Sequence, residues 1–335
     1  MKGILKTAAI AALTFGTTSA ALATELRLSV ETPPGHVRNQ AAEKWEQLIE
    51  EKSGGSITVE VFPAAQLYRS ADAIRALASG ALDMSIQANV TLSRFEPNLS
   101  FSSLPMFFGR SAEEANEILQ GPIGEEVSAM MSSKGINVPG AAFLFAPQHS
   151  SFTTDAVVSS YADLEGLKLA TPPSPVSIAV MKELGALPQA APRAEIPLML
   201  SQGQIDGLAT VTELTITGGK MWEPGVKNIF ADYAGWGFYM PLVSKATMNK
   251  LTEAERSIIV EAWAETTGWA GDQAAAELAN ARATLTANGV TVTEASPEDI
   301  AARREALVAL QDQIIADSDM DAEFIARVST ALDGN

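Results

Sequence analysis

Apolar and polar positions along the chain recur in an order that predicts an α/β fold. Residues 26–30 and 57–62 alternate as strands do, and apolar side chains recur at helical spacing between them. A helix from Ser70 to Gly80 then leads into a strand over residues 82–87. This β-α-β-α-β order within about sixty residues predicts a parallel, doubly wound sheet.

The same pattern starts again after residue 148 and predicts a second α/β lobe. A strand over residues 167–170 precedes a helix to Gly185, and a helix over about 194–202 precedes a strand over 205–210. A further strand over residues 235–244 is expected to cross back to the first lobe. Two such units in series predict two lobes around a central cleft, with crossing strands as a hinge.

A long helix is predicted to span both lobes. The segment from Thr252 to Glu255 has the pattern of a capping box, and no proline interrupts the chain from there to Asn288. Only Gly268 and Gly271 break this stretch of about 35 residues, which is far longer than an average helix. The predicted boundaries are 24–147 plus about 236–270 for lobe I, and 148–235 plus about 271–335 for lobe II.

The first 23 residues predict a cleaved export signal. Lys2 and Lys6 precede an apolar run over residues 8–15, and the small residues of segment 21–23 predict cleavage near Ala23. The run is too short to span a bilayer, and the chain has no cysteine for a lipid anchor or a disulfide. We therefore expect a soluble periplasmic protein.

Charge and side-chain inventory favour a binding protein over an enzyme. The net charge is −17, which makes nucleic acid an unfavourable partner. The two histidines, His36 and His149, lack metal-ligand spacing, and no nucleophile elbow, dinucleotide-binding turn or P-loop occurs. We expect no metal and no cofactor. An exported hydrolase and a sensor module on the same scaffold are the alternatives.

Several segments resemble the periplasmic solute-binding proteins of TRAP transporters, the DctP family. They are GGSITVEVFPAAQL (54–67), ALASGALDMSI (76–86), the Leu104-Pro105 pair with Phe107-Phe108, DLEGLKL (163–169), ELGALPQ (183–189) and SQGQIDGL (201–208). The resemblance implies a two-lobe periplasmic-binding-protein-like fold with hinge strands and a lobe-spanning helix. It also implies a protein that captures a small solute and delivers it to a membrane permease driven by an ion gradient. We expect this protein to be a monomer.

The chain departs from the family pattern where the resemblance implies ligand contacts. The arginine that ends the strand of the GLK segment is replaced by Ala170. A second arginine position falls on Ser150, beside His149, and an asparagine position falls on Thr210. Because a buried carboxylate without a cation is heavily penalised, these changes favour a neutral or cationic solute such as an amino alcohol or polyol.

The alternative is an organic acid held by a relocated arginine. Arg193 is the first candidate, because it stands where the resemblance implies an apolar residue near the ligand. Each candidate can also be an ordinary solvated surface arginine. The further candidates are Arg38, Arg69 and Arg94.

Polar and aromatic residues at the predicted strand ends complete the expected site. Glu31 follows the first strand, where a carboxylate suits an amine or a hydroxyl, and Glu213 adds negative charge after Thr210. Trp236 could place an indole face against a cation. The remaining expected contacts are Tyr68, Gln87 and Asn89.

Overall fold

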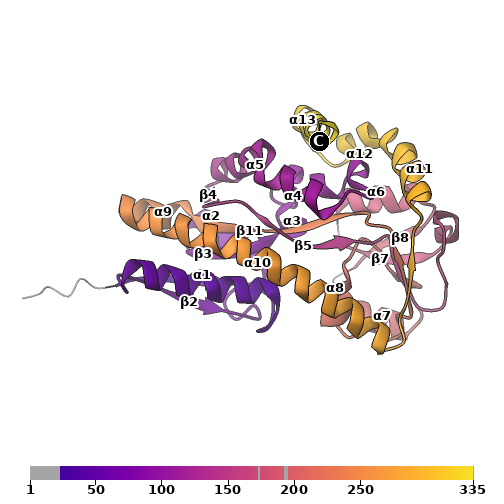
Figure 1. Cartoon of the computed structure of the whole chain (residues 1–335), viewed down its shortest axis with the longest axis horizontal. Coiled ribbons are helices and arrows are strands. Elements are labelled where there is room, and N and C mark those ends of the chain that lie inside the picture. The colour runs from indigo at the N-terminus through magenta and orange to yellow at the C-terminus, as the bar shows by residue number, and fades with distance from the viewer. Residues whose placement is uncertain (1–22, 173, 192–194, 335) are drawn as a thin grey trace, which may run out of the picture.

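The computed structural model describes residues 23–172, 174–191 and 195–334, which form two mixed sheets flanked by helices (Figure 1). The first sheet has the strand order β2-β1-β3-β11-β4, and β5 also pairs with β11. Its strands are β1 (Thr24–Ser29), β2 (Ile57–Phe62), β3 (Met84–Ala88), β4 (Ile136–Asn137), β5 (Phe143–Gln148) and β11 (Gly235–Ser244). The predicted return of segment 235–244 to the first lobe is confirmed, because β11 runs antiparallel beside β3.

Parallel pairing in the first sheet places the ends of β1 and β3 at one edge. Ser29 of β1 is in register with Ser85 of β3. Helix α1 (Val37–Ser53) and the long helix α10 (Glu253–Ala287) share an apolar cluster with β1, β2 and β3. Trp45 of α1 and Trp263 of α10 meet edge-on there, with ring centroids 4.8 Å apart. This packing fixes the start of α1 beside the polar end of the sheet.

The second sheet has the order β12-β10-β6-β9-β7-β8. Strands β7, β8 and β9 are parallel, and β6 is antiparallel to both β9 and β10. Its strands are β6 (Ser151–Thr153), β7 (Lys168–Thr171), β8 (Leu187–Ala190), β9 (Gly207–Leu208), β10 (Asn228–Ala231) and β12 (Thr291–Glu294). Its helices include α6 (Pro175–Glu183), α7 (Ile196–Ser201) and α8 (Glu213–Gly218).

Helix α10 runs past both sheets, as predicted (Figure 1). It has 35 residues and begins with a complete capping box between Thr252 and Glu255. A Cβ at Gly268 or Gly271 would meet no atom within 4 Å, so close packing does not explain these two glycines. In the described part of the chain, no helix is both long and apolar enough to cross a membrane.

Most of the remaining helices cover the first sheet on the side away from α1 and continue along the second lobe (Figure 1). Near the carboxyl end of the chain, α13 contacts α4 while α12 contacts α6, so this segment touches both lobes. The sequence-based lobe boundaries stay a prediction. These elements are α2 (Ser70–Ser79), α3 (Asn89–Leu92), α4 (Ala112–Gln120), α5 (Pro122–Ser133), α9 (Lys245–Lys250), α11 (Pro297–Val308), α12 (Gln311–Asp317), α13 (Ala322–Asp333), and the 3-10 turns at Pro97–Ser103, Pro105–Phe107 and Tyr161–Leu164.

Candidate functional site

Polar side chains gather in lobe I where β1 and β3 end and α1 and α2 begin. Gln87 donates to Ser85 Oγ over 2.7 Å, and Ser85 Oγ donates to the carbonyl of Ser29 over 2.6 Å. The exposed carboxylate of Glu31 accepts a hydrogen bond from the backbone N–H of Ser70 over 3.1 Å. Five buried polar atoms of this cluster have no partner among the described residues: Ser29 Oγ, Thr32 Oγ1, Arg38 Nη2, Ser70 Oγ and Gln87 Oε1.

Arg38 is the buried cation of this cluster. Arg38 is only 4% exposed, and its Nε–H donates to the carbonyl of Ile86 over 2.6 Å. The guanidinium carbon lies 5.4 Å from the ring centroid of Tyr239. Burial lowers the pKa of Arg38, against the opposing influence of Tyr239 and Glu31. The interpretation of Arg38 as a solvated surface arginine is therefore wrong.

The other candidate cations have different surroundings. Arg69 and Arg94 are exposed, as expected for surface arginines. Arg193 lies outside the described residues. Ala170 is fully buried at the end of β7 and packs into the apolar core of lobe II. Lobe II therefore offers the solute no cation from position 170.

The predicted lobe II residues meet at one end of β6, β7 and β9. Thr210 Oγ1 lies 2.8 Å from Thr171 Oγ1, and the Thr210 backbone adopts a left-handed φ of 51°. Its N–H donates to the carbonyl of His149 over 2.9 Å. Thr210 thus stands beside the strand ends where the sequence placed it.

His149, Ser150 and Glu213 belong to a buried network. Ser150 donates from both its backbone N–H, over 2.8 Å, and its hydroxyl to the carboxylate of Asp232. His149 Nε2 lies 3.4 Å from Glu213 Oε1, and Arg282 of α10 donates to the same oxygen from Nε over 2.7 Å. These contacts satisfy the Ser150 hydroxyl and Glu213 Oε1, while His149 Nε2 and Glu213 Oε2 are buried without a hydrogen-bond partner among the described residues.

Burial and partners shift the two carboxylates of this network in opposite directions. Burial raises the pKa of Asp232, although His149 and Ser150 act against it. Burial also acts to raise the pKa of Glu213, but hydrogen bonds from His149 and Arg282 outweigh it and hold that pKa below its usual value. The network joins lobe II to the lobe-spanning helix.

Three further predicted residues form hydrogen bonds or pack inside lobe I. Asn89 donates to Ser102 Oγ over 3.1 Å and accepts from the N–H of Phe238 over 3.3 Å. Trp236 donates from Nε1 to the carbonyl of Arg110 over 2.9 Å. Tyr68 is half-buried against the apolar cluster that includes α2. Whether any of these contacts the solute stays a prediction.

The amino-acid sequence matches the model of a known protein family. Residues 28–318 match the family model DctP, described as bacterial extracellular solute-binding protein, family 7. The chain belongs to this family. DctP proteins bind solutes for transport, so the chain is a binding protein of a transporter and not an enzyme. Membership also implies a small-molecule ligand and a membrane permease as partner.

Relatives of the DctP family resemble the chain along most of its length. A solute-binding protein of Roseobacter denitrificans is 28% identical over 300 residues, which are 88% of each chain. The 2,3-diketo-L-gulonate-binding periplasmic protein YiaO of Escherichia coli is 30% identical over 197 residues, which are 59% of each chain.

Solved structures confirm the two-lobe fold. A TRAP periplasmic solute-binding protein from Ochrobactrum anthropi superposes with a TM-score of 0.86 at 25% identity, covering 93% of this chain and 95% of that chain. The sugar acid binding protein DctPAm of Advenella mimigardefordensis, solved with galactonate, gives a TM-score of 0.83 at 20% identity, covering 93% and 98%. The second likeness concerns the fold alone.

Sequence reasoning missed two parts of this candidate site. The first is the burial of Arg38, which no local pattern distinguishes from a surface arginine. The second is the pairing of Asp232 with Ser150 and of Arg282 with Glu213, across separations of 82 and 69 residues. Only tertiary packing brings these groups together.

Proposed function

We propose that this protein captures a small hydroxylated organic acid in the periplasm and delivers it to a TRAP permease. The buried guanidinium of Arg38, with its unpartnered Nη2, carries the proposal. Burying a charge without a close counter-ion is costly, and a ligand carboxylate supplies that counter-ion through strong, charge-assisted hydrogen bonds.

Hydroxyl groups complement the rest of the lobe I cluster. Gln87 Oε1 is a buried acceptor without a donor, and Glu31 offers an exposed carboxylate at the end of β1. A solute hydroxyl donates to such oxygens, while its own oxygen accepts from Ser or Thr hydroxyls. Because Arg38 Nη2 and Gln87 Oε1 are covered by neighbouring atoms, binding includes a local rearrangement that uncovers them.

The ligands named for similar structures support an acid over the neutral or cationic solute that Ala170 favours. The Advenella protein was solved with galactonate, and a Sulfitobacter protein with β-D-galacturonate at a TM-score of 0.82. In our proposal Arg38 of lobe I supplies the cation. The lack of an arginine at position 170 in lobe II therefore does not exclude an acid. If an amine or a polyol binds more tightly than the acid, the solute is neutral or cationic, as the sequence favours.

Three further expectations belong to the same proposal. We propose export with cleavage near Ala23, a soluble periplasmic monomer, and the lobe boundaries given above. Mass measurement of the protein recovered from periplasm tests the cleavage site. Light scattering with and without solute tests the monomer.

A calorimetric titration of matched solutes tests the ligand class. We expect purified protein to bind D-galactonate or a related sugar acid at least tenfold more tightly than galactitol or D-galactosamine. Arg38→Gln should weaken acid binding by about 30-fold or more, because truncating one partner of a buried charge pair costs about 2–5 kcal/mol. Arg94→Gln, which changes an exposed arginine, is the matched control.

Two outcomes would contradict the proposal. One is acid binding that Arg38→Gln and Arg38→Lys both leave unchanged. The other is a panel in which polyols or amines bind and acids do not. Lysine keeps the charge but lacks the planar fork, so Arg38→Lys provides a second variant if glutamine prevents folding.

A further inference from the structure

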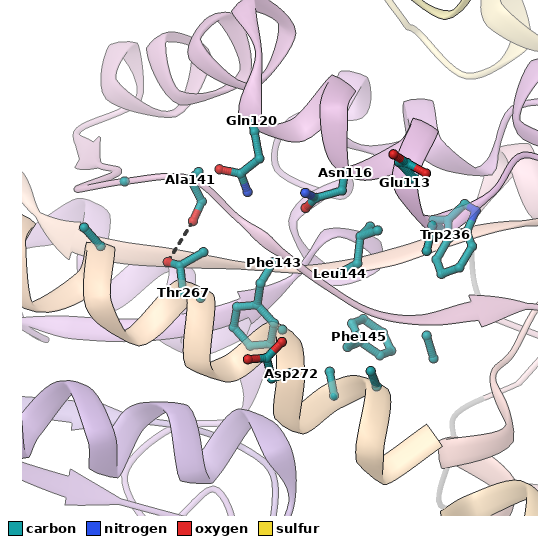
Figure 2. Close-up of a pocket in the computed structure, with 18 of the residues that line it drawn as sticks. Glu113, Asn116, Gln120, Ala141, Phe143, Leu144, Phe145, Trp236, Thr267 and Asp272 are labelled. Carbon is teal, nitrogen blue, oxygen red and sulfur yellow. Dashed lines mark hydrogen bonds between the residues drawn. The ribbon is translucent and has the colours of Figure 1, made fainter. Parts of the chain in front are cut away.

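A groove lies beside β5, between α4 and α10 (Figure 2). Its volume of about 790 Å³ is within the range of pockets that hold small molecules. Helix α4 forms one wall, residues 139–146 form the floor, and the middle of α10 forms the other wall. Of the described residues that the sequence assigned to the solute, this lining contains only Trp236.

The lining combines aromatic rings with acidic side chains. Phe143 and Phe145 project from β5 and Trp236 lies at one end, but only Phe145 is partly exposed, since Phe143 and Trp236 are 2% and 6% exposed. Glu113 on α4 and Asp272 on α10 are the charged residues of the lining, and both are exposed. Among the described lining residues there is no lysine, arginine or histidine.

Two glycines keep the α10 wall open. Gly268 and Gly271 line the groove, and a Cβ at either position would meet no atom within 4 Å. Glycine inside a helix is destabilising relative to alanine. Since packing does not require these glycines, their effect here is to leave room over the helix backbone.

We propose that this groove is a second binding site, for a small molecule with a flat apolar body and a protonated amine. The partly exposed ring of Phe145 accepts the apolar body, and the amine lies between that ring and the carboxylate of Glu113 or Asp272. This charge preference is opposite to that of Arg38, so the site does not depend on the proposed transport ligand. The ring centroids of Phe145 and Tyr239 are stacked 4.3 Å apart, which places the floor of the groove against the ring beside Arg38.

Three probes that share a phenyl group test the site by ligand-observed NMR or calorimetry on the purified protein. Phenethylamine should bind, and 2-phenylethanol and phenylacetate should bind at least tenfold more weakly. Asp272→Asn should weaken amine binding several-fold, and Gly268→Leu should abolish it by filling the groove. The matched controls on α10 are Glu261→Gln and Ala276→Leu, which lie outside the lining and should leave binding unchanged.

The proposal is overturned if phenethylamine does not bind, or if Gly268→Leu leaves its binding intact. Equal binding of all three probes would also overturn it, because the carboxylates would then contribute nothing. Arg38→Gln should leave amine binding unchanged while weakening the sugar acid. That difference separates failure of this site from failure of the proposed function.

Discussion

Replacing Arg282 by methionine should reveal the cost of burying Glu213 without its partner. Glu213 is 1% exposed and accepts from both Nε and Nη2 of Arg282. Breaking a buried pair costs about 3–5 kcal/mol, and we take about 3 kcal/mol because the Arg282 side chain is 32% exposed. At about 2 °C for each kcal/mol, the unfolding midpoint Tm should fall by about 6 °C.

The pH dependence of this loss follows from the lowered pKa of Glu213. In the wild type the stabilisation is present above the unfolded pKa and is lost as pH falls through the lower folded pKa. Without Arg282, burial instead favours the protonated acid. The gap in Tm between wild type and Arg282→Met should therefore be widest near neutral pH and should narrow below about pH 4.

Calorimetry or circular dichroism on unliganded protein measures this effect. Glu213→Gln combined with Arg282→Met should recover part of the lost Tm, because no buried charge is left unpaired. Arg75→Met is the control, since Arg75 forms an exposed pair with Asp72 and should cost under about 0.5 kcal/mol. A Tm for Arg282→Met within 1 °C of wild type, or a gap that widens in acid, would refute the reasoning.

A crowded glycine, a glycine in open space and a buried acid give further predictions. Gly207→Ala should cost about 1–3 kcal/mol, because its Cβ would lie 2.2 Å from the carbonyl oxygen of Phe152. Gly268→Ala should stabilise by about 1 kcal/mol, since it adds helix propensity in open space; urea unfolding that ranks the two alike would count against both. Asp232→Asn should gain Tm relative to wild type as pH rises over the range above about 4, because the raised pKa of Asp232 means that its contribution is lost as pH rises through the folded pKa. A difference that stays constant across that range would show that Asp232 does not titrate there.

Local sequence signals predicted several secondary elements and the long helix, but not strands such as β5, β10 and β12. The capping box at Thr252 and the absence of proline predicted α10 from 253 to 288, and the helix is Glu253–Ala287. Such signals depend on neighbours within a few positions, so one sequence contains them in full. The return of β11 to the first sheet also followed from its position after the second α/β unit.

The site was less predictable because its contacts are tertiary. Arg38 is buried because α1 packs on the first sheet, and its partners Ile86 and Tyr239 are 48 and 201 positions away. Ser150 and Glu213 were assigned to the solute from family position and proximity, but their side chains bond to Asp232 and Arg282. Residue type and spacing alone do not show which polar groups already have partners.

The most direct measurement is a crystal structure of the protein with the solute that co-purifies with it, identified by mass spectrometry. Our account predicts an organic acid at the ends of β1 and β3, with a carboxylate oxygen within 3.2 Å of the Arg38 guanidinium. A neutral or cationic solute, or an acid whose carboxylate is held by Arg193 while Arg38 stays covered, would contradict it.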